Sequence, residues 1–395
     1  MDGVVEPGGV MPITACRVCG HRLFDAPLLR YRNMPKSAQF LPAADDLARE
    51  RGVDMTIRQC SGCGLVQLDS EPVSYYREVI RAAAFSQEMG VFRHGQFSDF
   101  VNRFALRGKK VVEIGCGRGE YLSIMARCGV EAYGLEFAAD AVSHAQKSGL
   151  RVTKGYVGDA TCTLEHAPFD AFFILNFMEH LPDLNTVLGG IRRNLSIGGL
   201  GLVEVPNFDM ILRNKLFAEF VTDHLFYFTK DTLTTTLKMN GFDVLECTEI
   251  LHDYVISAVV RHRGPLDIAS FDAHQHFLEA KVEDYLSRFG PKRVAIWGAG
   301  HQALAIMALC GLGGRIRYIV DSAVFKQGRY SPATHIPIVA PDMLRTDPVD
   351  AVIVMAGGYS AEVAALVRNT WAPAADVAIL REFGLEIVPR TARLS

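Results

Sequence analysis

The stretch 109–136 constrains the fold more than any other part of this 395-residue chain. An apolar run, 111–114, enters a turn with three glycines, and a helical pattern then continues to about Gly129. A second apolar run, 132–135, closes on Glu136, about twenty residues after the glycines. Strand, glycine turn, helix and strand, with a carboxylate at the tip of the second strand, form the arrangement that holds a ribose. We therefore expect an adenosine-bearing cofactor.

The turn reads E-I-G-C-G-R-G at 113–119, an acid followed by three glycines at alternate positions. This spacing resembles the E/D-x-G-x-G-x-G loop of class I S-adenosylmethionine methyltransferases more than the G-x-G-x-x-G turn of dinucleotide enzymes, which stays the alternative. The resemblance implies that the loop passes under the methionine part of the cofactor and that Glu136 accepts both ribose hydroxyls. The expected cofactor-binding residues of this unit are Glu113, Gly115, Gly117, Gly119 and Glu136.

Two polar residues at later strand ends are further candidates for cofactor binding. Asp159 lies beyond the third expected strand, where it can meet the adenine amine, and Asn176 ends the fourth. An ordinary turn aspartate is the alternative for Asp159.

The length of the chain indicates several domains, and its charge argues against a highly charged binding partner. A chain of 395 residues, 49% of them hydrophobic, is too long for one ordinary core but can build two or three. We expect three domains, 1–85, 86–262 and 263–395. A net charge of −3 without Lys/Arg runs argues against nucleic acid or a membrane as partner. No apolar stretch could cross a bilayer and no signal-peptide pattern begins the chain, so a cytoplasmic location is expected.

The pattern predicts two α/β units joined by a helix. The first is a doubly wound parallel sheet with a late antiparallel edge, whose strands are expected at 111–114, 131–135, 152–155, 171–175, 200–205 and 254–260. An amphipathic stretch, 268–289, predicts a linker helix. The βαβ pattern then restarts, with Gly298 and Gly300 in a turn and Asp321 after the next strand. We expect no second cofactor there, because two intact cofactor sites in one chain are improbable.

Four of the nine cysteines form two C-x-x-C pairs, each followed by glycine: Cys16 with Cys19, and Cys60 with Cys63. Thiolates at this spacing can surround one tetrahedral Zn²⁺. The surrounding segment is loop-rich, with too little apolar periodicity to hold a core unaided, so we expect a structural zinc. Redox or incidental cysteines are the alternative. The odd total fits a reducing compartment.

Two histidines are candidates for proton chemistry, because histidine has an unperturbed pKa near neutrality. His180 lies in an E-H-L run, which in methyltransferases packs beside the cofactor pocket. His224 follows Asp223, which can orient it, and precedes a run of aromatic residues. We therefore favour His224 as the base.

The order of the parts resembles the sugar C-methyltransferases of deoxysugar biosynthesis, which alkylate nucleotide-linked 4-keto sugars. The most specific matches are C-G-L-V-Q-L at 63–68, V-E-V-P-N at 203–207, acid-His-x-x-Tyr-Phe at 223–228 and K-Q-G-R-Y-S-P-A-T-H-I-P-I at 326–338. The resemblance implies that His224 is the base. Where the family usually has Tyr-His-Glu-His, this chain has V-T-D-H at 221–224. The tyrosine expected to bind the sugar is then either missing or replaced by Tyr76.

These observations give a leading hypothesis and two alternatives. The leading one is a methyltransferase that uses S-adenosylmethionine to form a C–C bond on a nucleotide-linked keto sugar, with His224 removing the proton α to the ketone. An O- or N-methyltransferase acting on a related sugar or small polar metabolite would share every cofactor residue. A catalytically weak scaffold, with the zinc and C-terminal units binding a partner, is the third.

Overall fold

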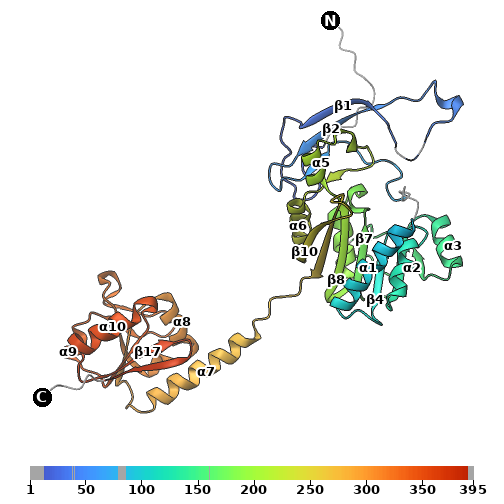
Figure 1. Ribbon diagram of the computed structural model, residues 1–395. Coiled ribbons are helices and arrows are strands. Elements are labelled where there is room, and N and C mark those ends of the chain that lie inside the picture. Colours follow the sequence, from blue (N-terminus) through green and yellow to red (C-terminus); the bar gives the residue numbers. More distant parts are fainter. Residues whose placement is uncertain (1–12, 38, 40, 79–85, 160, 390–395) are drawn as a thin grey trace, which may run out of the picture. The chain divides into compact units, whose positions relative to one another are not determined.

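The computed structural model describes residues 13–37, 39, 41–78, 86–159 and 161–389 (Figure 1). Contacts divide the chain into two compact units, 1–264 and 265–395. Within the described residues, the first unit holds a four-stranded and a seven-stranded sheet, and the second holds another seven-stranded sheet. The expected domain boundary between residues 85 and 86 adjoins residues outside this description, so it stays a prediction. The first residues of the chain, on which the expectation of a cytoplasmic location rests, also lie outside the described residues.

The small sheet has the order β1-β2-β3-β9 and is antiparallel. Its strands are β1 (Leu29–Met34), β2 (Val53–Gln59), β3 (Val66–Leu68) and β9 (Phe226–Tyr227). β2 buries Met55 and Ile57 at alternate positions, as one face of a sheet requires. The N-terminal segment, expected to be loop-rich and unable to hold a core unaided, supplies three of these strands, and Phe208 and Phe220, far along the chain, complete the core of this sheet.

The large sheet of the first unit has the order β10-β11-β8-β7-β4-β5-β6. Its strands are β4 (Lys110–Ile114), β5 (Glu131–Glu136), β6 (Val152–Lys154), β7 (Phe169–Leu175), β8 (Leu195–Pro206), β10 (Phe242–Ile250) and β11 (Val255–His262). The first five are mutually parallel, and β11 is antiparallel to β8 and β10. The antiparallel strand therefore lies one position inside the edge, which the unexpected β10 occupies. The hydrophobic pattern of the sequence did not predict β10, because Phe242 is its only buried residue.

Helices cover both faces of this sheet (Figure 1). They are α1 (Gln87–Arg103), α2 (Glu120–Arg127), α3 (Ala139–Lys147), α4 (Leu184–Arg193) and α6 (Lys230–Met239). The unit also contains α5 (Phe208–Asn214), whose buried residues belong to the core of the small sheet, and the short 3-10 turns η1 (Ala44–Asp46), η2 (Met178–His180) and η3 (Phe217–Glu219). α1, α2 and α3 share one core cluster with the sheet, and α4 and α6 share the other. β4 contributes side chains to both clusters, because Val111 belongs to the first while Val112 and Ile114 belong to the second. The α/β fold expected for the core is confirmed.

The second unit begins with α7 (Ala269–Leu286), which buries Val282, Tyr285 and Leu286 against its sheet. The strands are β12 (Val294–Trp297), β13 (Ile316–Val320), β14 (Arg329–Tyr330), β15 (Pro337–Val339), β16 (Ala351–Val354), β17 (Asp376–Arg381) and β18 (Gly384–Val388). Their order is β14-β15-β13-β12-β16-β17-β18, with the two edge strands antiparallel. The remaining elements are α8 (His301–Leu309), α9 (Met343–Thr346), α10 (Ser360–Leu366), the 3-10 turns η4 (Leu312–Gly314), η5 (Val324–Lys326) and η6 (Gly357–Tyr359), and the π-helical turn η7 (Val367–Trp371). None of the helices described in the chain is both long and apolar enough to span a bilayer.

Candidate functional site

The glycine turn between β4 and α2 needs glycine for its backbone shape. Gly115, Gly117 and Gly119 have φ of 71°, 56° and 88°, in the left-handed region that other residues rarely adopt. A Cβ on Gly115 would lie 2.9 Å from the Phe177 ring, and one on Gly119 would lie 2.3 Å from Leu150. The turn therefore packs closely against Phe177 and Leu150, and it lies at the carboxyl end of the sheet, where α/β proteins bind ligands.

Glu136, the last residue of β5, braces this turn. One carboxylate oxygen accepts a hydrogen bond from Gly117 N and the other from Ala138 N, both at 2.8 Å. Each carboxylate oxygen has a second lone pair, so the group can also accept hydroxyl protons. The residues present thus fit an adenosine cofactor, and the ribose contact stays a prediction.

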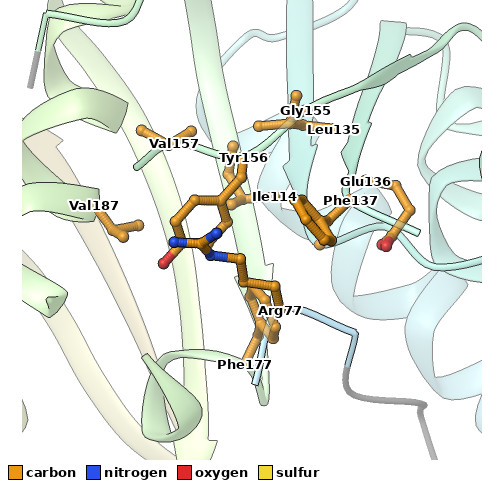
Figure 2. A pocket seen from close by; sticks show the side chains of 11 residues that line it. Arg77, Ile114, Leu135, Glu136, Phe137, Gly155, Tyr156, Val157, Phe177 and Val187 are labelled. Carbon is orange, nitrogen blue, oxygen red and sulfur yellow. The ribbon is translucent and has the colours of Figure 1, made fainter. Parts of the chain in front are cut away.

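A pocket opens beside Glu136 at the ends of the parallel strands (Figure 2). It is lined by Arg77, Ile114, Gly115, Leu135, Glu136, Phe137, Gly155, Tyr156, Val157, Phe177 and Val187. The Arg77 guanidinium carbon lies 4.7 Å from the Tyr156 ring centroid and 5.7 Å from that of Phe137. Burial raises the pKa of the Tyr156 hydroxyl to about 12. Sequence reasoning missed these three residues; Phe137 could have been found from its place after Glu136, whereas Arg77 carries no local signal.

Three other expected cofactor residues occupy different surroundings. Glu113 is buried within β4. Asn176 is exposed at the end of β7 with φ of 49°. Asp159 is exposed two residues beyond Val157, and its carboxylate accepts hydrogen bonds from the backbone N–H and hydroxyl of Thr161. The contacts of these residues with a cofactor stay predictions.

The fold brings His180 and His224 together. Their ring centroids lie 4.7 Å apart with the planes at 79°, an edge-to-face arrangement. Two hydrogen bonds brace it: His180 Nδ1 meets the Asp223 carbonyl at 2.8 Å, and Leu225 N donates to the Glu179 carbonyl at 2.8 Å. The His180 ring also lies 6.4 Å from that of Phe177, which lines the pocket. The histidine pair therefore borders the candidate cofactor pocket.

Both rings are held neutral by their surroundings. Burial lowers the pKa of His180 below its usual value. Burial first, and then the neighbouring His180, lower the pKa of His224 to about 3. His224 is nevertheless partly exposed, whereas His180 is buried. A neutral ring that a substrate can reach is able to accept a proton.

The segment before residue 79 contributes two tyrosines to this site. The Tyr75 hydroxyl donates to the Asp223 carboxylate at 2.8 Å. The Tyr76 ring meets the edge of the Tyr156 ring, with centroids 6.4 Å apart. Sequence reasoning named Tyr76 and Asp223 but missed Tyr75. Asp223 is thus positioned by Tyr75 and holds His180 through its backbone carbonyl.

The four paired cysteines form a cluster whose sulfurs lie within 4.8 Å of one another. Cys16 Sγ and Cys63 Sγ are 3.8 Å apart, and Cys19 Sγ and Cys60 Sγ are 3.3 Å apart. Four thiolates bound tetrahedrally at ~2.3 Å from one zinc stand about 3.8 Å apart, so the cluster has the size of such a site. Backbone N–H groups of Val18 and Gly62 point at Cys16 and Cys60 sulfurs, which favours thiolates.

Comparison with known proteins agrees with this architecture. The family described as "Methyltransferase domain" matches residues 89–247, and the family described as "C-methyltransferase C-terminal domain" matches 270–375. Over 393 residues the chain is 26% identical to C-methyltransferase NovU of Streptomyces niveus, covering 90% of this chain and 92% of that protein. It is 30% identical over 100 residues to a ubiquinone biosynthesis O-methyltransferase of Methylococcus capsulatus, covering 24% of this chain and 42% of that protein.

Among solved structures, an S-adenosylmethionine-dependent methyltransferase from Clostridium acetobutylicum is 13% identical, with a TM-score of 0.37, covering 48% of this chain and 96% of that one. The methyltransferase domain match, together with the glycine turn and Glu136, defines an S-adenosylmethionine-dependent methyltransferase. The C-terminal domain match and the near full-length similarity to NovU accompany it, and both support methyl transfer to carbon.

Proposed function

We propose that this enzyme methylates a carbon of a nucleotide-linked 4-keto sugar through an enolate, with His224 as the base. The observation that carries the proposal is the placement of the neutral His180–His224 pair beside the pocket wall at Phe177. The full-length similarity to a protein named as a C-methyltransferase supports carbon as the acceptor atom.

The proposed reaction begins with the acceptor ketone, whose α proton is too weakly acidic to leave unaided. His224 accepts this proton on a ring nitrogen, and the electron pair of the broken C–H bond forms the enolate. Tyr76 is proposed to offer its hydroxyl to the substrate, and hydrogen-bond donors aimed at the enolate oxygen would lower the barrier. Bound S-adenosylmethionine supplies an electrophilic methyl group to the site. Gly115, Gly117 and Glu136 are proposed to hold it.

The test is His224→Asn, assayed with a nucleotide-linked 4-keto hexose and S-adenosylmethionine. The variant should bind S-adenosylhomocysteine almost normally yet lose roughly 10²–10⁴-fold in turnover, the usual share of general-base catalysis. Wild-type enzyme should also exchange deuterium from solvent into the carbon α to the ketone. Near-normal turnover of the variant would place the base elsewhere, with His180 and Tyr76 next in line. Efficient methylation of a substrate without a ketone would instead favour O- or N-methylation.

We also propose that the cysteine cluster holds one structural zinc. Four thiolates fill the coordination sphere of zinc and leave no position for substrate, so the ion would stabilise the fold rather than take part in the reaction. One equivalent of zinc per chain should copurify with the reduced protein, and metal analysis that finds none would refute the proposal.

A further inference from the structure

Glu179 is an acid enclosed beside the histidine pair. It is 1% exposed, in the middle of η2, and its Oε2 makes no hydrogen bond within the described part of the chain. Its Oε1 lies 3.8 Å from His180 Nε2. A buried acid with one oxygen that makes no hydrogen bond is costly when charged, so its protonation state needs an explanation.

The hydrogen bond on the other side of the His180 ring settles the tautomer. His180 Nδ1 lies 2.8 Å from the Asp223 carbonyl, and a carbonyl can only accept. Nδ1 therefore carries the proton, and in the neutral ring Nε2 presents a lone pair. Glu179 Oε1 lies 3.8 Å from this nitrogen.

A charged carboxylate facing a lone pair would be repelled, whereas a protonated carboxyl can donate to it. Burial raises the pKa of Glu179 to about 8, in agreement with the neutral acid. The titratable groups around it are His180 and His224, whose pKa values are both lowered, and beyond them Asp223, which is paired with the Tyr75 hydroxyl. A modest movement from 3.8 Å would form the Glu179–His180 hydrogen bond.

We propose that Glu179 is a positioning residue: a neutral acid that holds His180 as the Nδ1–H tautomer and keeps an uncharged ring edge-on to His224. A charged His180 would oppose protonation of its neighbour, since like charges disfavour each other. Glu179 thus acts through His180 to prevent a further loss of basicity at His224. This role rests on the proposed function only in naming His224 as the base.

The tautomer can be measured without a substrate, by NMR of the full chain labelled with ¹⁵N-histidine. His180→Asn assigns the signals. Wild type and Glu179→Gln, which keeps an uncharged donor of the same shape, should show the proton of His180 on Nδ1. Glu179→Leu removes the donor to Nε2 and leaves only the Asp223 carbonyl to favour the Nδ1–H form, so a measurable Nε2–H population should appear. Glu246→Leu, which removes an exposed acid of β10, is the matched control and should leave the signals unchanged.

Turnover with the 4-keto sugar nucleotide supplies the second measurement. Glu179→Leu should lose about 10²-fold in kcat, the scale of a misplaced catalytic group, while S-adenosylhomocysteine affinity is unchanged. Glu179→Gln should retain most of the turnover.

Three results would overturn the proposal. Glu179→Gln could be as inactive as Glu179→Leu, which would mean that the charge is needed. Glu179→Leu could keep both the tautomer and the turnover. A second metal equivalent could copurify, because the ligand atoms of Glu179, His180 and His224 lie within 4.8 Å of one another. Normal turnover of His224→Asn would instead remove the proposed base and leave the tautomer result standing.

Discussion

The two large sheets have the same hydrogen bonds around the acid that follows the glycine turn. In the first unit, the Glu136 carboxylate accepts one hydrogen bond from Gly117 N in the turn and another from Ala138 N, two residues after the acid. In the second unit, the Asp321 carboxylate accepts one hydrogen bond from Ala299 N in the turn and another from Ala323 N, again two residues after the acid. An acid at this position therefore braces a glycine turn whether or not a ligand binds, so its presence alone is weak evidence for a cofactor.

The surroundings of the two acids differ. Lys326 Nζ lies 2.9 Å from the Asp321 carboxylate and neutralises it, and it also reaches the Ala299 carbonyl. Glycines with positive φ continue through the first turn, whereas in the second Gly298 has φ of 114° and Gly300 has φ of −82°. A pocket also lies beside the second turn, between the ends of β12 and β16. The two turns therefore share the βαβ pattern and differ in the acid, which keeps uncommitted lone pairs in the first unit and is paired with Lys326 in the second.

The largest expected effect is on the free energy of unfolding of the two units. Cys60→Ser should destabilise the first unit by more than about 4 kcal/mol, because binding of a structural metal is folding free energy. Cys310→Ser, at a partly buried cysteine of the second unit, should change its unfolding little. Calorimetric scans with metal analysis check this. Equal effects of the two changes would show that the first unit does not depend on a metal.

The next effect compares the turns. Gly115→Ala should weaken S-adenosylhomocysteine binding by about 3 kcal/mol, because it combines a strained positive φ with displacement of the Phe177 ring. Gly300→Ala adds a Cβ with nothing within 4 Å and should change neither affinity nor stability appreciably. Titration calorimetry distinguishes them. Tight binding by the Gly115 variant would mean that the ligand does not approach this turn.

The acids give a smaller effect. Glu136→Gln should weaken S-adenosylhomocysteine binding by roughly 1.5–3 kcal/mol, because an amide would set a donor against a backbone donor or a ribose hydroxyl. Asp321→Asn should leave that affinity unchanged and lower only the stability of the second unit. If both variants bind equally well, Glu136 braces the turn without holding the ribose.

The smallest effect is a pH dependence of the first unit. Glu179 has a pKa of about 8 when folded and 4.5 when unfolded, so its burial costs progressively more stability as pH rises through that window. Relative to wild type, Glu179→Gln should gain up to about 1.4 kcal/mol over the single pH unit from 6.5 to 7.5. The lowered pKa values of His180 and His224 act with the opposite sign below pH ~6.5, but equally in both proteins. Denaturant titrations would contradict this if the difference stayed flat.

Local sequence patterns predicted much of the fold, but they did not predict Arg77 and Tyr156, which line the pocket beside Glu136. The six strands expected in the core are present, because most of them are buried on both faces and are therefore nearly continuous apolar runs. β10 was missed because it is an edge strand with few buried residues. Arg77 and Tyr156 were missed because their contact joins segments that no periodicity connects.

The sequence by itself determined the glycine turn, the order of strands and helices and the two cysteine pairs, because backbone conformation and burial on one face act over a few residues. Only the tertiary structure decided that β9 pairs with β3, which joins the N-terminal segment to the core, and that Tyr75 meets Asp223. It also decided that His180 lies against His224 and that Glu179 is enclosed beside them. These contacts join residues up to 161 positions apart, or depend on neighbours that exclude water, and short-range spacing carries no information about either.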